Sequence, residues 1–191
     1  MSYPRNAFSE QNTERLWQLI DEHPLATLVI PNSDTPFVHM SLSLNHDKTH
    51  LLGHANPANP LTQLDKAHLQ VLFRGPDAYL SPSEVKGLPL PTWDYATAHI
   101  RGQLTQITNP EEKRSALHQQ LKQFESPVNP WDMSVLSDNQ ITKLFSQLFF
   151  FKIKIESITG TFKLSQNKSD ETRQRIAHLL ETQGNPLSRY Y

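Results

Sequence analysis

The stretch LPTWDYATAHIRGQLTQI, residues 90–107, does most to decide the class of fold. From position 93 onward its odd-numbered residues are aromatic or polar, namely Trp93, Tyr95, Thr97, His99 and Arg101. Because successive side chains of a strand point to opposite faces, this alternation predicts a long β-strand that gathers these residues on one face. Such a face can hold a planar ring system or form a subunit interface, and both interpretations stay open at this point.

Other segments with strand character lie on both sides of this stretch. They cover residues 25–30, 37–45, 50–54, 69–75, 78–81 and 149–160. Turn-forming residues separate the segments within the first 107 residues, and one short predicted helix interrupts them. Parallel strands would need a crossover of about a dozen residues or more after each strand. The pattern therefore predicts a mainly β fold with peripheral helices, in which the antiparallel strands form a barrel or a sandwich.

Helix signals are fewer, and capping residues mark them. The side chains of Ser and Asn accept hydrogen bonds from the first free N–H groups of a helix, and the predicted N-caps are Ser9, Asn59, Asn109 and Ser169. Pro24 ends the first helix, since the residue before a proline avoids helical backbone angles. We expect one domain over residues 1–191, with C-terminal helical elements at about 109–148 and 169–182.

The composition excludes several classes of protein. The chain has 191 residues, with 18 Lys and Arg against 19 Asp and Glu, and it has no Cys. The lack of Cys excludes disulfides, thiolate zinc sites and thiolate-held iron–sulfur clusters. A near-neutral charge argues against a protein that mainly binds nucleic acid phosphates, because such binding rests on clustered Lys and Arg. No apolar run approaches the roughly 20 residues of a membrane span and no signal-peptide pattern is present, so we expect a soluble cytoplasmic protein.

The segment GHANPANPL, residues 53–61, joins a strand that ends at His54 to a helix that begins at Asn59. Free backbone N–H groups at a helix start can bind an anion such as a phosphate. The residues alone favour the simpler interpretation that Asn59 only caps the helix, since most helix starts bind nothing but water. In the same way, Ser165, Gln166 and Asn167 follow a strand end and form either part of a pocket or a turn before the last helix.

Histidine spacing gives little sign of a metal site. His46, His50 and His54 are four residues apart, but they straddle a turn and do not share one helix face. We therefore expect no metal. A haem-binding protein is a further interpretation, for which the candidate axial ligands are His39, His54 and His99.

Four motifs in a fixed order carry a family resemblance. They are GHANPANP at residues 53–60, FRGPDAYLSPS at 73–83, PTWDY at 91–95 followed by Gly102, and GTFKLSQN at 160–167. Their order and spacing resemble those of the PaiB family of FMN-binding negative transcriptional regulators, and the resemblance extends from residue 3 to about residue 180. It implies the FMN-binding split barrel, an antiparallel β-barrel of six to seven strands.

The resemblance also implies a homodimer with two sites at the subunit interface, which bind FMN, a related flavin or another small phosphorylated ligand. The phosphate is then expected near residues 54–59, and the isoalloxazine ring against residues of both chains. The residues of this chain that are expected to contact the cofactor are His54, Asn59, Arg74, Thr92, Trp93, His99, Lys163, Ser165, Gln166 and Asn167. Any reaction would be hydride or electron transfer by the flavin, with the protein supplying orientation and electrostatics.

The chain departs from the family pattern at positions close to the expected phosphate. Pro57 replaces the usual Arg or Lys, and a lost charge-assisted contact of this kind is worth about 1.5–3 kcal/mol. Asp77 and Asp94 replace the usual His and Asn and add negative charge, unless Arg74 or Arg101 compensates for it. These departures favour an alternative, a flavin-free split barrel that keeps the dimer and acts as a regulatory or interaction protein.

The regulatory role that the family name implies does not require contact with DNA. The sequence has no helix-turn-helix with a basic recognition helix, and the last predicted helix carries only Arg173 and Arg175 besides His178. We therefore expect no direct DNA binding, and a regulatory role would act through a protein partner or a small ligand.

Overall fold

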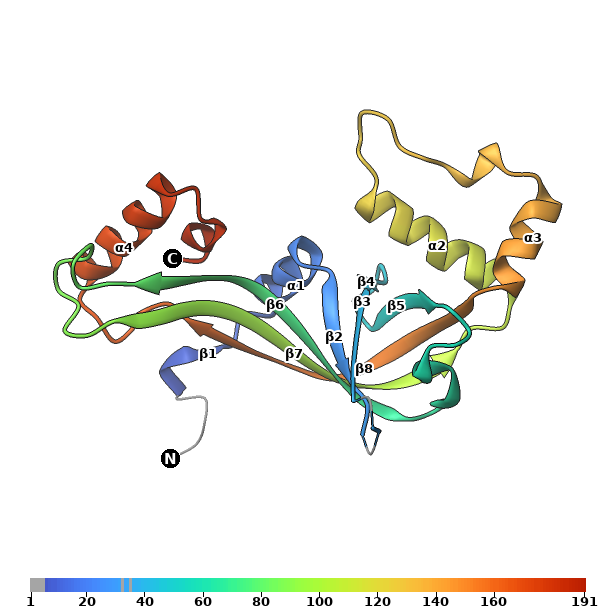
Figure 1. Cartoon of the computed structure of the whole chain (residues 1–191), viewed down its shortest axis with the longest axis horizontal. Coiled ribbons are helices and arrows are strands. Elements are labelled where there is room, and N and C mark those ends of the chain that lie inside the picture. The colour runs from blue at the N-terminus through green and yellow to red at the C-terminus, as the bar shows by residue number, and fades with distance from the viewer. Residues whose placement is uncertain (1–5, 32, 35) are drawn as a thin grey trace. The chain divides into compact units, whose positions relative to one another are not determined.

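Three long strands form the centre of the sheet (Figure 1). The computed structural model describes residues 6–31, 33–34 and 36–191. The long strands are β6 (His68–Leu80), β7 (Thr92–Gln106) and β8 (Phe149–Lys163). The shorter strands are β1 (Ser9–Glu10), β2 (Leu25–Val29), β3 (Phe37–Ser41), β4 (Ser43–Leu44) and β5 (His50–Ala55).

The order of the strands confirms the predicted fold class. Within the described residues the order is β3-β2-β6-β7-β8-β5-β4, and β1 pairs with β8. The pairing of β2 with β3 and of β5 with β8 is antiparallel, with His50 opposite Lys154 and Ala55 opposite Phe149. The protein therefore has the mainly β, antiparallel split-barrel fold with peripheral helices that the sequence predicts.

The sequence predicts two strands in a place where the structure has one. Residues 69–75 and 78–81 are not two strands but parts of one, β6. Gly75 and Pro76 form a turn signal in the sequence, yet both lie inside this strand, since the fixed φ of proline is compatible with extended backbone. At the other end of the chain, β8 continues beyond the expected residue 160 as far as Lys163.

The first helix also begins later than predicted. Ser9 is not its N-cap but lies in β1, where it pairs with Thr161 of β8. Helix α1 (Thr13–Glu22) is capped by Asn12, whose side chain accepts a hydrogen bond from the Glu14 N–H at 3.0 Å. Pairing with β8 holds Ser9 in extended backbone, so the cap falls to the residue that directly precedes the helix.

Further helices lie where the sequence predicts them. They are α2 (Pro110–Phe124), α3 (Asp138–Ser146) and α4 (Asp170–Thr182). Asn109 caps α2 and Ser169 caps α4, as predicted, and a capping box between Ser137 and Gln140 opens α3. Short 3-10 helices join other elements, namely η1 (Asn6–Phe8), η2 (Pro60–Gln63), η3 (Met133–Val135) and η4 (Pro186–Tyr190).

Contacts between residues divide the chain into two compact units. Unit 1 consists of residues 1–23, 73–99 and 158–191, and unit 2 consists of residues 24–72 and 100–157. Each of the three long strands begins in one unit and ends in the other, so neither unit is a continuous piece of chain. The single domain over residues 1–191 remains a prediction.

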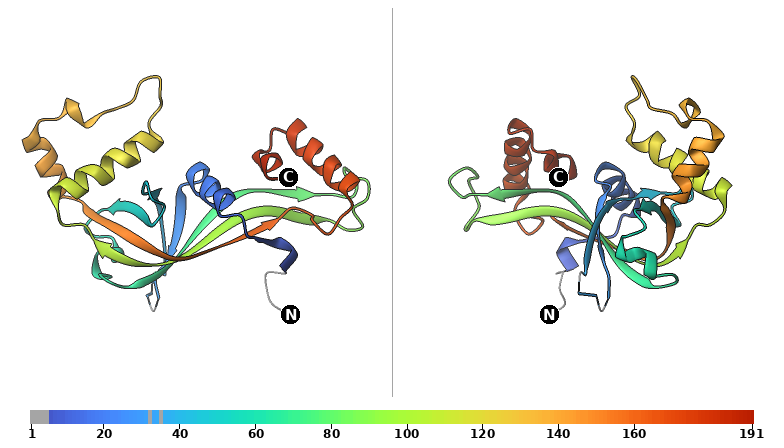
Figure 2. Two further views of the ribbon diagram at one scale, coloured as in Figure 1. Left: turned by 180° about the vertical axis from the view of Figure 1, so that it is seen from behind. Right: turned by 45° about the vertical axis from the view of Figure 1, so that its right-hand side comes forward.

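In unit 1, α1 packs against the sheet through its apolar face. The buried residues of this helix are Leu16, Leu19 and Ile20. A side chain at Gly160 of β8 would clash with Leu16, so the close approach of α1 requires glycine there. The η4 segment is tied to α1 by Arg15, whose Nη2 donates to the Tyr190 carbonyl oxygen at 2.6 Å. Figure 2 shows these elements of unit 1 from two further sides.

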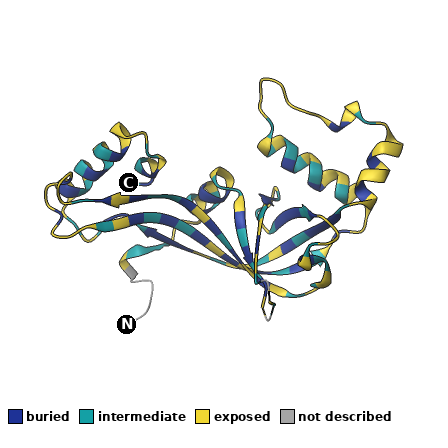
Figure 3. Ribbon diagram, viewed as in Figure 1, coloured by how far each residue is buried: buried dark blue, intermediate teal, exposed yellow. Residues whose placement is uncertain are grey.

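In unit 2, α2 and α3 share a hydrophobic core with the sheet. The buried members of this core are Leu52, Ile107, Ala116, Met133, Ile141, Phe145 and Phe150. The rings of Phe145 on α3 and Phe150 on β8 meet edge to face, with 5.1 Å between their centroids. Figure 3 shows buried residues on the inner side of these helices and exposed residues on their outer side.

Candidate functional site

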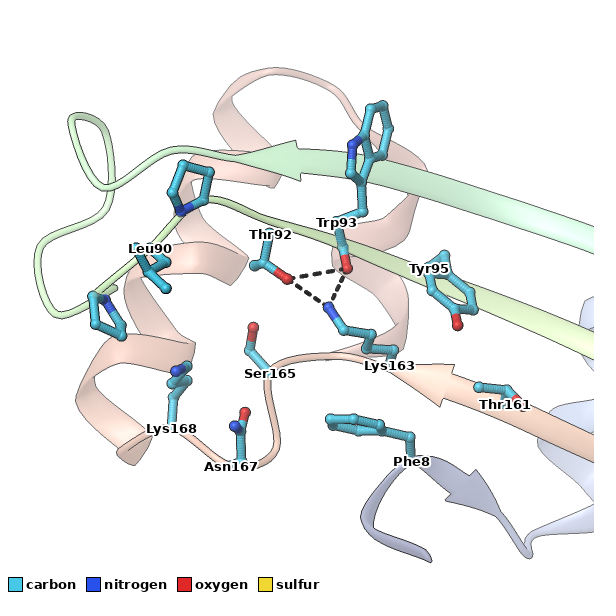
Figure 4. Close-up of a pocket in the computed structure, with 12 residues that line it drawn as sticks. Phe8, Leu90, Thr92, Trp93, Tyr95, Thr161, Lys163, Ser165, Asn167 and Lys168 are labelled. Atoms are coloured by element: carbon cyan, nitrogen blue, oxygen red, sulfur yellow. Dashed lines mark hydrogen bonds between the residues drawn. The ribbon is translucent and has the colours of Figure 1, made fainter. Parts of the chain in front are cut away.

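Unit 1 contains a pocket of about 580 Å³ (Figure 4), a volume within the usual range of small-molecule sites. Its walls come from η1, from the start of β7 with the segment that leads into it, and from the end of β8 with the turn that follows. The apolar and aromatic lining residues are Phe8, Pro89, Leu90, Pro91, Trp93 and Tyr95. The polar lining residues are Thr92, Thr161, Lys163, Ser165, Asn167 and Lys168.

Strand β7 has the exposed face that its alternation predicts. The odd-numbered residues from 93 to 101 are exposed or half-buried, whereas the even-numbered residues from 94 to 100 are buried. Trp93 is 55% exposed, and its ring centroid lies 5.8 Å from that of Tyr79 on β6. Exposed aromatic side chains that lie together on a sheet are typical of a surface that binds a ligand or a partner.

Lys163 is held in the wall of the pocket by acceptors from β7. Its Nζ donates to Thr92 Oγ1 at 2.6 Å, to the carbonyl oxygen of Trp93, and to Asp94 Oδ1 at 3.0 Å. An ammonium group has three hydrogens, so the protein itself uses all of them. Figure 4 shows the contacts with Thr92 and Trp93 as dashed lines.

Asp94 is fully buried and carries the negative charge that compensates Lys163. Its Oδ2 accepts hydrogen bonds from Ser165 Oγ at 2.6 Å and from the Tyr191 hydroxyl. Burial and the hydrogen bond to Asp94 raise the pKa of Tyr191 well above its ordinary value. A buried carboxylate is stable where a cation and several donors surround it, so the charge of Asp94 is neutralised inside unit 1.

The turn after β8 is fixed by its own hydrogen bonds. Gln166 Oε1 accepts from the Leu164 N–H at 2.8 Å, and its Nε2 donates to the Phe162 carbonyl oxygen. Gln166 therefore ties the turn together and does not line the pocket. Asn167 is exposed and Lys168 is half-buried, and both lie in the wall.

Arg74 is exposed on β6 and lies outside the pocket lining. It forms a salt bridge with Asp77 three residues further on, and so compensates one of the two carboxylates that depart from the family pattern. Arg101, the other candidate for this role, pairs instead with Glu156 in unit 2, at 3.5 Å between Nε and Oε2.

His99 is exposed on β7 and also lies outside the pocket lining. Partial desolvation of its ring lowers the pKa of His99 below its ordinary value, which favours the neutral imidazole at pH 7. The three histidines considered as haem ligands each contact a polar side chain at 2.9–3.4 Å, namely Thr27 for His39, Gln120 for His54 and Thr97 for His99.

His54 lies in unit 2, where a buried glutamine fixes its ring. His54 Nδ1 lies 2.9 Å from Gln120 Oε1, and Gln120 Nε2 donates to the Leu52 carbonyl oxygen at 3.1 Å. Because Gln120 presents its oxygen to the ring, Nδ1 of His54 is the donor. In the neutral ring Nε2 is then an acceptor, and it can donate to an anion only after protonation.

Asn59, the other residue expected near a phosphate, also lies in unit 2. Its side chain accepts a hydrogen bond from the Leu61 N–H at 3.0 Å and so caps η2. This 3-10 helix has four residues, too few to align the peptide dipoles that attract an anion to a helix start. Capping therefore accounts for the geometry of Asn59.

Half of the predicted contact residues meet in the pocket of unit 1. They are Thr92, Trp93, Lys163, Ser165 and Asn167. The predicted contact residues of unit 1 that lie outside its lining are Arg74, His99 and Gln166. The remaining two, His54 and Asn59, belong to unit 2.

Several residues of this site were not predicted from the sequence. Lys168 directly follows the fourth motif and could have been included on that ground. Phe8 and Leu90 lie in the wall but stand outside every motif. Tyr191 contacts Asp94 across 97 positions of the chain, and no local pattern links the two.

Two features are absent from residues 6–31, 33–34 and 36–191. These residues contain no group of three or more His, Cys, Asp or Glu side chains arranged to hold a metal ion. None of their helices is long and apolar enough to span a lipid bilayer.

Comparison with known proteins finds relatives over most of the chain. The model of a family described as “Putative FMN-binding domain” matches residues 2–157. The “Protease synthase and sporulation protein PAI 2” of Bacillus subtilis strain 168 is 29% identical over 187 residues, which cover 94% of this chain and 89% of that protein.

Solved structures share the fold at low sequence identity. The flavocytochrome Anf3 of Azotobacter vinelandii has a TM-score of 0.64 at 11% identity, over 89% of this chain and 75% of that one. The FAD and heme binding protein of Mycobacterium smegmatis has a TM-score of 0.62 at 18% identity, over 90% and 80% of the two chains. By the match over residues 2–157, the chain belongs to the family of FMN-binding domains, as its four sequence motifs predict.

Proposed function

We propose that the protein is a homodimer that binds a flavin, with FMN as the first candidate and with the flavin ring in the pocket of unit 1. The observation that carries this proposal is the pocket itself, which has aromatic walls and a polar edge in a member of an FMN-binding family. The names of two proteins with the same fold, a flavocytochrome and an FAD and heme binding protein, give further support.

The residues of the pocket suit a planar ring with polar edges. Phe8, Pro89 and Tyr95 offer apolar surface to the faces of a ring. The Asn167 amide can donate to and accept from ring carbonyl and N–H groups, and Lys168 adds a cation. When bound, a flavin supplies hydride or electron transfer, and these side chains bind the ring, orient it and exclude water from its faces.

Residues 54–59, where the family resemblance places the phosphate of FMN, offer few groups that could bind it. His54 donates from Nε2 only when it is protonated, and the side chain of Asn59 is already used as a cap. Pro57 is exposed and has neither a charge nor an N–H group. We therefore expect riboflavin, which lacks the phosphate, to bind almost as tightly as FMN.

Titration of the purified protein with FMN, FAD and riboflavin tests the flavin proposal. The expected result is saturable quenching of flavin fluorescence with a stoichiometry of one flavin per chain. A folded protein that leaves the fluorescence of all three flavins unchanged would establish the alternative, a flavin-free member of the family.

The exposed aromatic surface of unit 1 supports the homodimer. Tyr79 is 52% exposed and Trp93 is 55% exposed, and their ring centroids lie 5.8 Å apart. Sedimentation velocity of Trp93→Ser should show a shift toward monomer. The control Trp131→Ser removes an exposed tryptophan of unit 2 and should leave the dimer intact. A wild-type protein that is monomeric at all concentrations would contradict the homodimer.

A regulatory role is the second part of the proposal. It draws support from the name of the Bacillus subtilis relative, which contains the words “protease synthase” and “sporulation”. Because the net charge of the protein is −1, we infer that such a role acts through the bound flavin or a protein partner, not through DNA. Salt-sensitive binding to duplex DNA at physiological ionic strength would contradict this inference.

A further inference from the structure

The two ammonium groups that line the pocket of unit 1 are not equivalent. All three hydrogens of Lys163 are bonded to acceptors on β7, and Asp94 compensates its charge. Within the described part of the chain, no hydrogen bond or ion pair engages the side chain of Lys168. The charge of Lys168 is therefore the one that remains available to a ligand.

The hydrogen bonds around Asp94 make it costly to break the ion pair between Lys163 and Asp94. The Asp94 carboxylate is fully buried, and an unpaired charge in that place would be costly. Ser165 and Tyr191 donate to the same carboxylate and hold it where Lys163 meets it. A ligand that accepted a hydrogen bond from Lys163 in place of Asp94 would weaken this buried pair. A hydrogen bond donated by Lys168 to a ligand breaks no such pair.

The other walls of the pocket are apolar and favour a ligand that is largely hydrophobic. Leu90 is 72% exposed between Pro89 and Pro91, and Phe8 is half-buried on another side of the pocket. Folding leaves this apolar surface uncovered, and a flat hydrophobic ligand would remove it from water.

We propose that this pocket binds a planar aromatic carboxylate and that Lys168, not Lys163, recognises its negative charge. Asp94 and Tyr191 are then positioning residues that keep Lys163 as a charge-compensated part of the wall. This inference goes beyond flavin binding, because it requires only the pocket of unit 1 and makes no use of a bound cofactor.

The experiment compares two probes that differ only in charge, naphthalene-2-carboxylate and naphthalene-2-carboxamide. Their affinities are measured by calorimetry, and binding is located by the backbone amide resonances of Ser165, Asn167 and Lys168. In the wild-type protein the carboxylate should bind about 1.5-fold to fivefold more tightly than the amide, the range expected for one partly exposed ion pair.

Variants then separate the two lysines. Lys168→Met should bring the two affinities together, and the control Lys86→Met, in an exposed loop of the same unit outside the pocket, should leave the preference unchanged. Asp94→Asn should increase the preference for the carboxylate, since Lys163 then carries an uncompensated charge. Removing the pair as a whole, with Lys163→Met and Asp94→Asn together, should leave the wild-type preference.

Three results would overturn the inference. The first is a wild-type protein whose Ser165, Asn167 and Lys168 resonances do not respond to naphthalene-2-carboxylate. The second is a Lys168→Met variant that keeps the preference. The third is a double variant that loses it. Added FMN gives a separate readout: if it binds without displacing the carboxylate, the proposed place of the flavin ring is wrong, but the role of Lys168 stands.

Discussion

The Asp94 carboxylate receives donors from three residues that are distant in sequence, and it lies entirely away from solvent. In the sequence, Asp94 replaces the Asn that is usual in the family and adds negative charge near the expected phosphate. In the structure its side chain lies on the buried side of β7, and its charge is compensated by Lys163. Position 94 therefore contributes to the stability of unit 1 and to the shape of its pocket.

Tyr191→Phe should destabilise the protein, because Asp94 loses one of its donors while remaining buried. Hydrogen bonds to charged groups contribute about 1.5–3 kcal/mol, and we expect a loss of this order in the free energy of unfolding. Urea denaturation measures it. The control Tyr79→Phe removes an exposed hydroxyl and should change stability little; equal losses in the two variants would contradict the role of Tyr191.

Stability should fall at alkaline pH. Burial and hydrogen bonds to Glu22 and Asp94 raise the pKa values of Tyr190 and Tyr191 above the ordinary value of about 10. Above pH 10 the unfolded chain therefore releases two protons that the folded chain keeps. The stabilisation is complete below pH 10 and is lost as pH rises beyond it.

Melting temperatures between pH 8 and pH 11 test this expectation. They should drop above pH 10, and the drop should be smaller in a variant with Tyr190→Phe and Tyr191→Phe. An identical pH dependence in the two proteins would show that other groups cause it.

Pro57→Arg should restore the cation that is usual in the family. If the phosphate of FMN lies near residues 54–59, the affinity for FMN should rise about tenfold or more, as expected for one charge-assisted contact. The affinity for riboflavin should not change. Parallel fluorescence titrations measure both, and an equal gain for both flavins would place the phosphate elsewhere.

Local chemistry in the sequence predicted some residue roles and not others. Asn109 and Ser169 were predictable as caps because a cap bonds to N–H groups within three residues. The salt bridge between Arg74 and Asp77 was also predictable, since the two residues are three positions apart. The partnership of Asp94 with Tyr191 depends on how distant parts of the chain pack, and one sequence carries no sign of it.

At the scale of elements, the contact of α1 with β8 depends on a residue without a side chain. Gly160→Ala would place a methyl group against Leu16, and overpacking of this kind typically costs about 1–3 kcal/mol. Thermal or urea denaturation of the single variant measures the cost. Combining Gly160→Ala with Leu16→Ala should cost less than the sum of the two single changes, and simple additivity would contradict the proposed clash.

Element types were predicted better than element boundaries. The long alternation from residue 93 specifies β7 correctly, because a period of two that is kept over many residues fits a strand and does not fit a helix. Gly75–Pro76 and Ser9 misled the prediction for a common reason. Each is a local signal for a turn or a cap, but pairing within the sheet holds all three residues in strands β6 and β1.

At the scale of the whole molecule, the two units share the three long strands. Local stability in one unit therefore depends on strands that continue into the other. We expect the single domain that the sequence predicts to unfold in one cooperative transition. Calorimetry should give one peak, and the tryptophan fluorescence and far-ultraviolet circular dichroism transitions should coincide. Two separated transitions would show that the units unfold independently.

The division into units was not predictable from the sequence. It follows from long-range contacts among segments such as 73–99 and 158–191, and no linker or change in composition marks the boundaries. The ten predicted contact residues belong to both units: eight lie in unit 1, and His54 and Asn59 lie in unit 2. That they bind one cofactor stays a prediction.

The interleaving of segments has a consequence for a chain that is cut. Val128 is 91% exposed in the connection between α2 and α3, an open position for proteolytic nicking. A cut there would produce two fragments, and each unit draws segments from both of them. Neither fragment would hold a complete unit, so the nicked protein should stay together as a complex and come apart only in denaturant. The same two fragments, produced separately, should be able to complement each other and rebuild the fold.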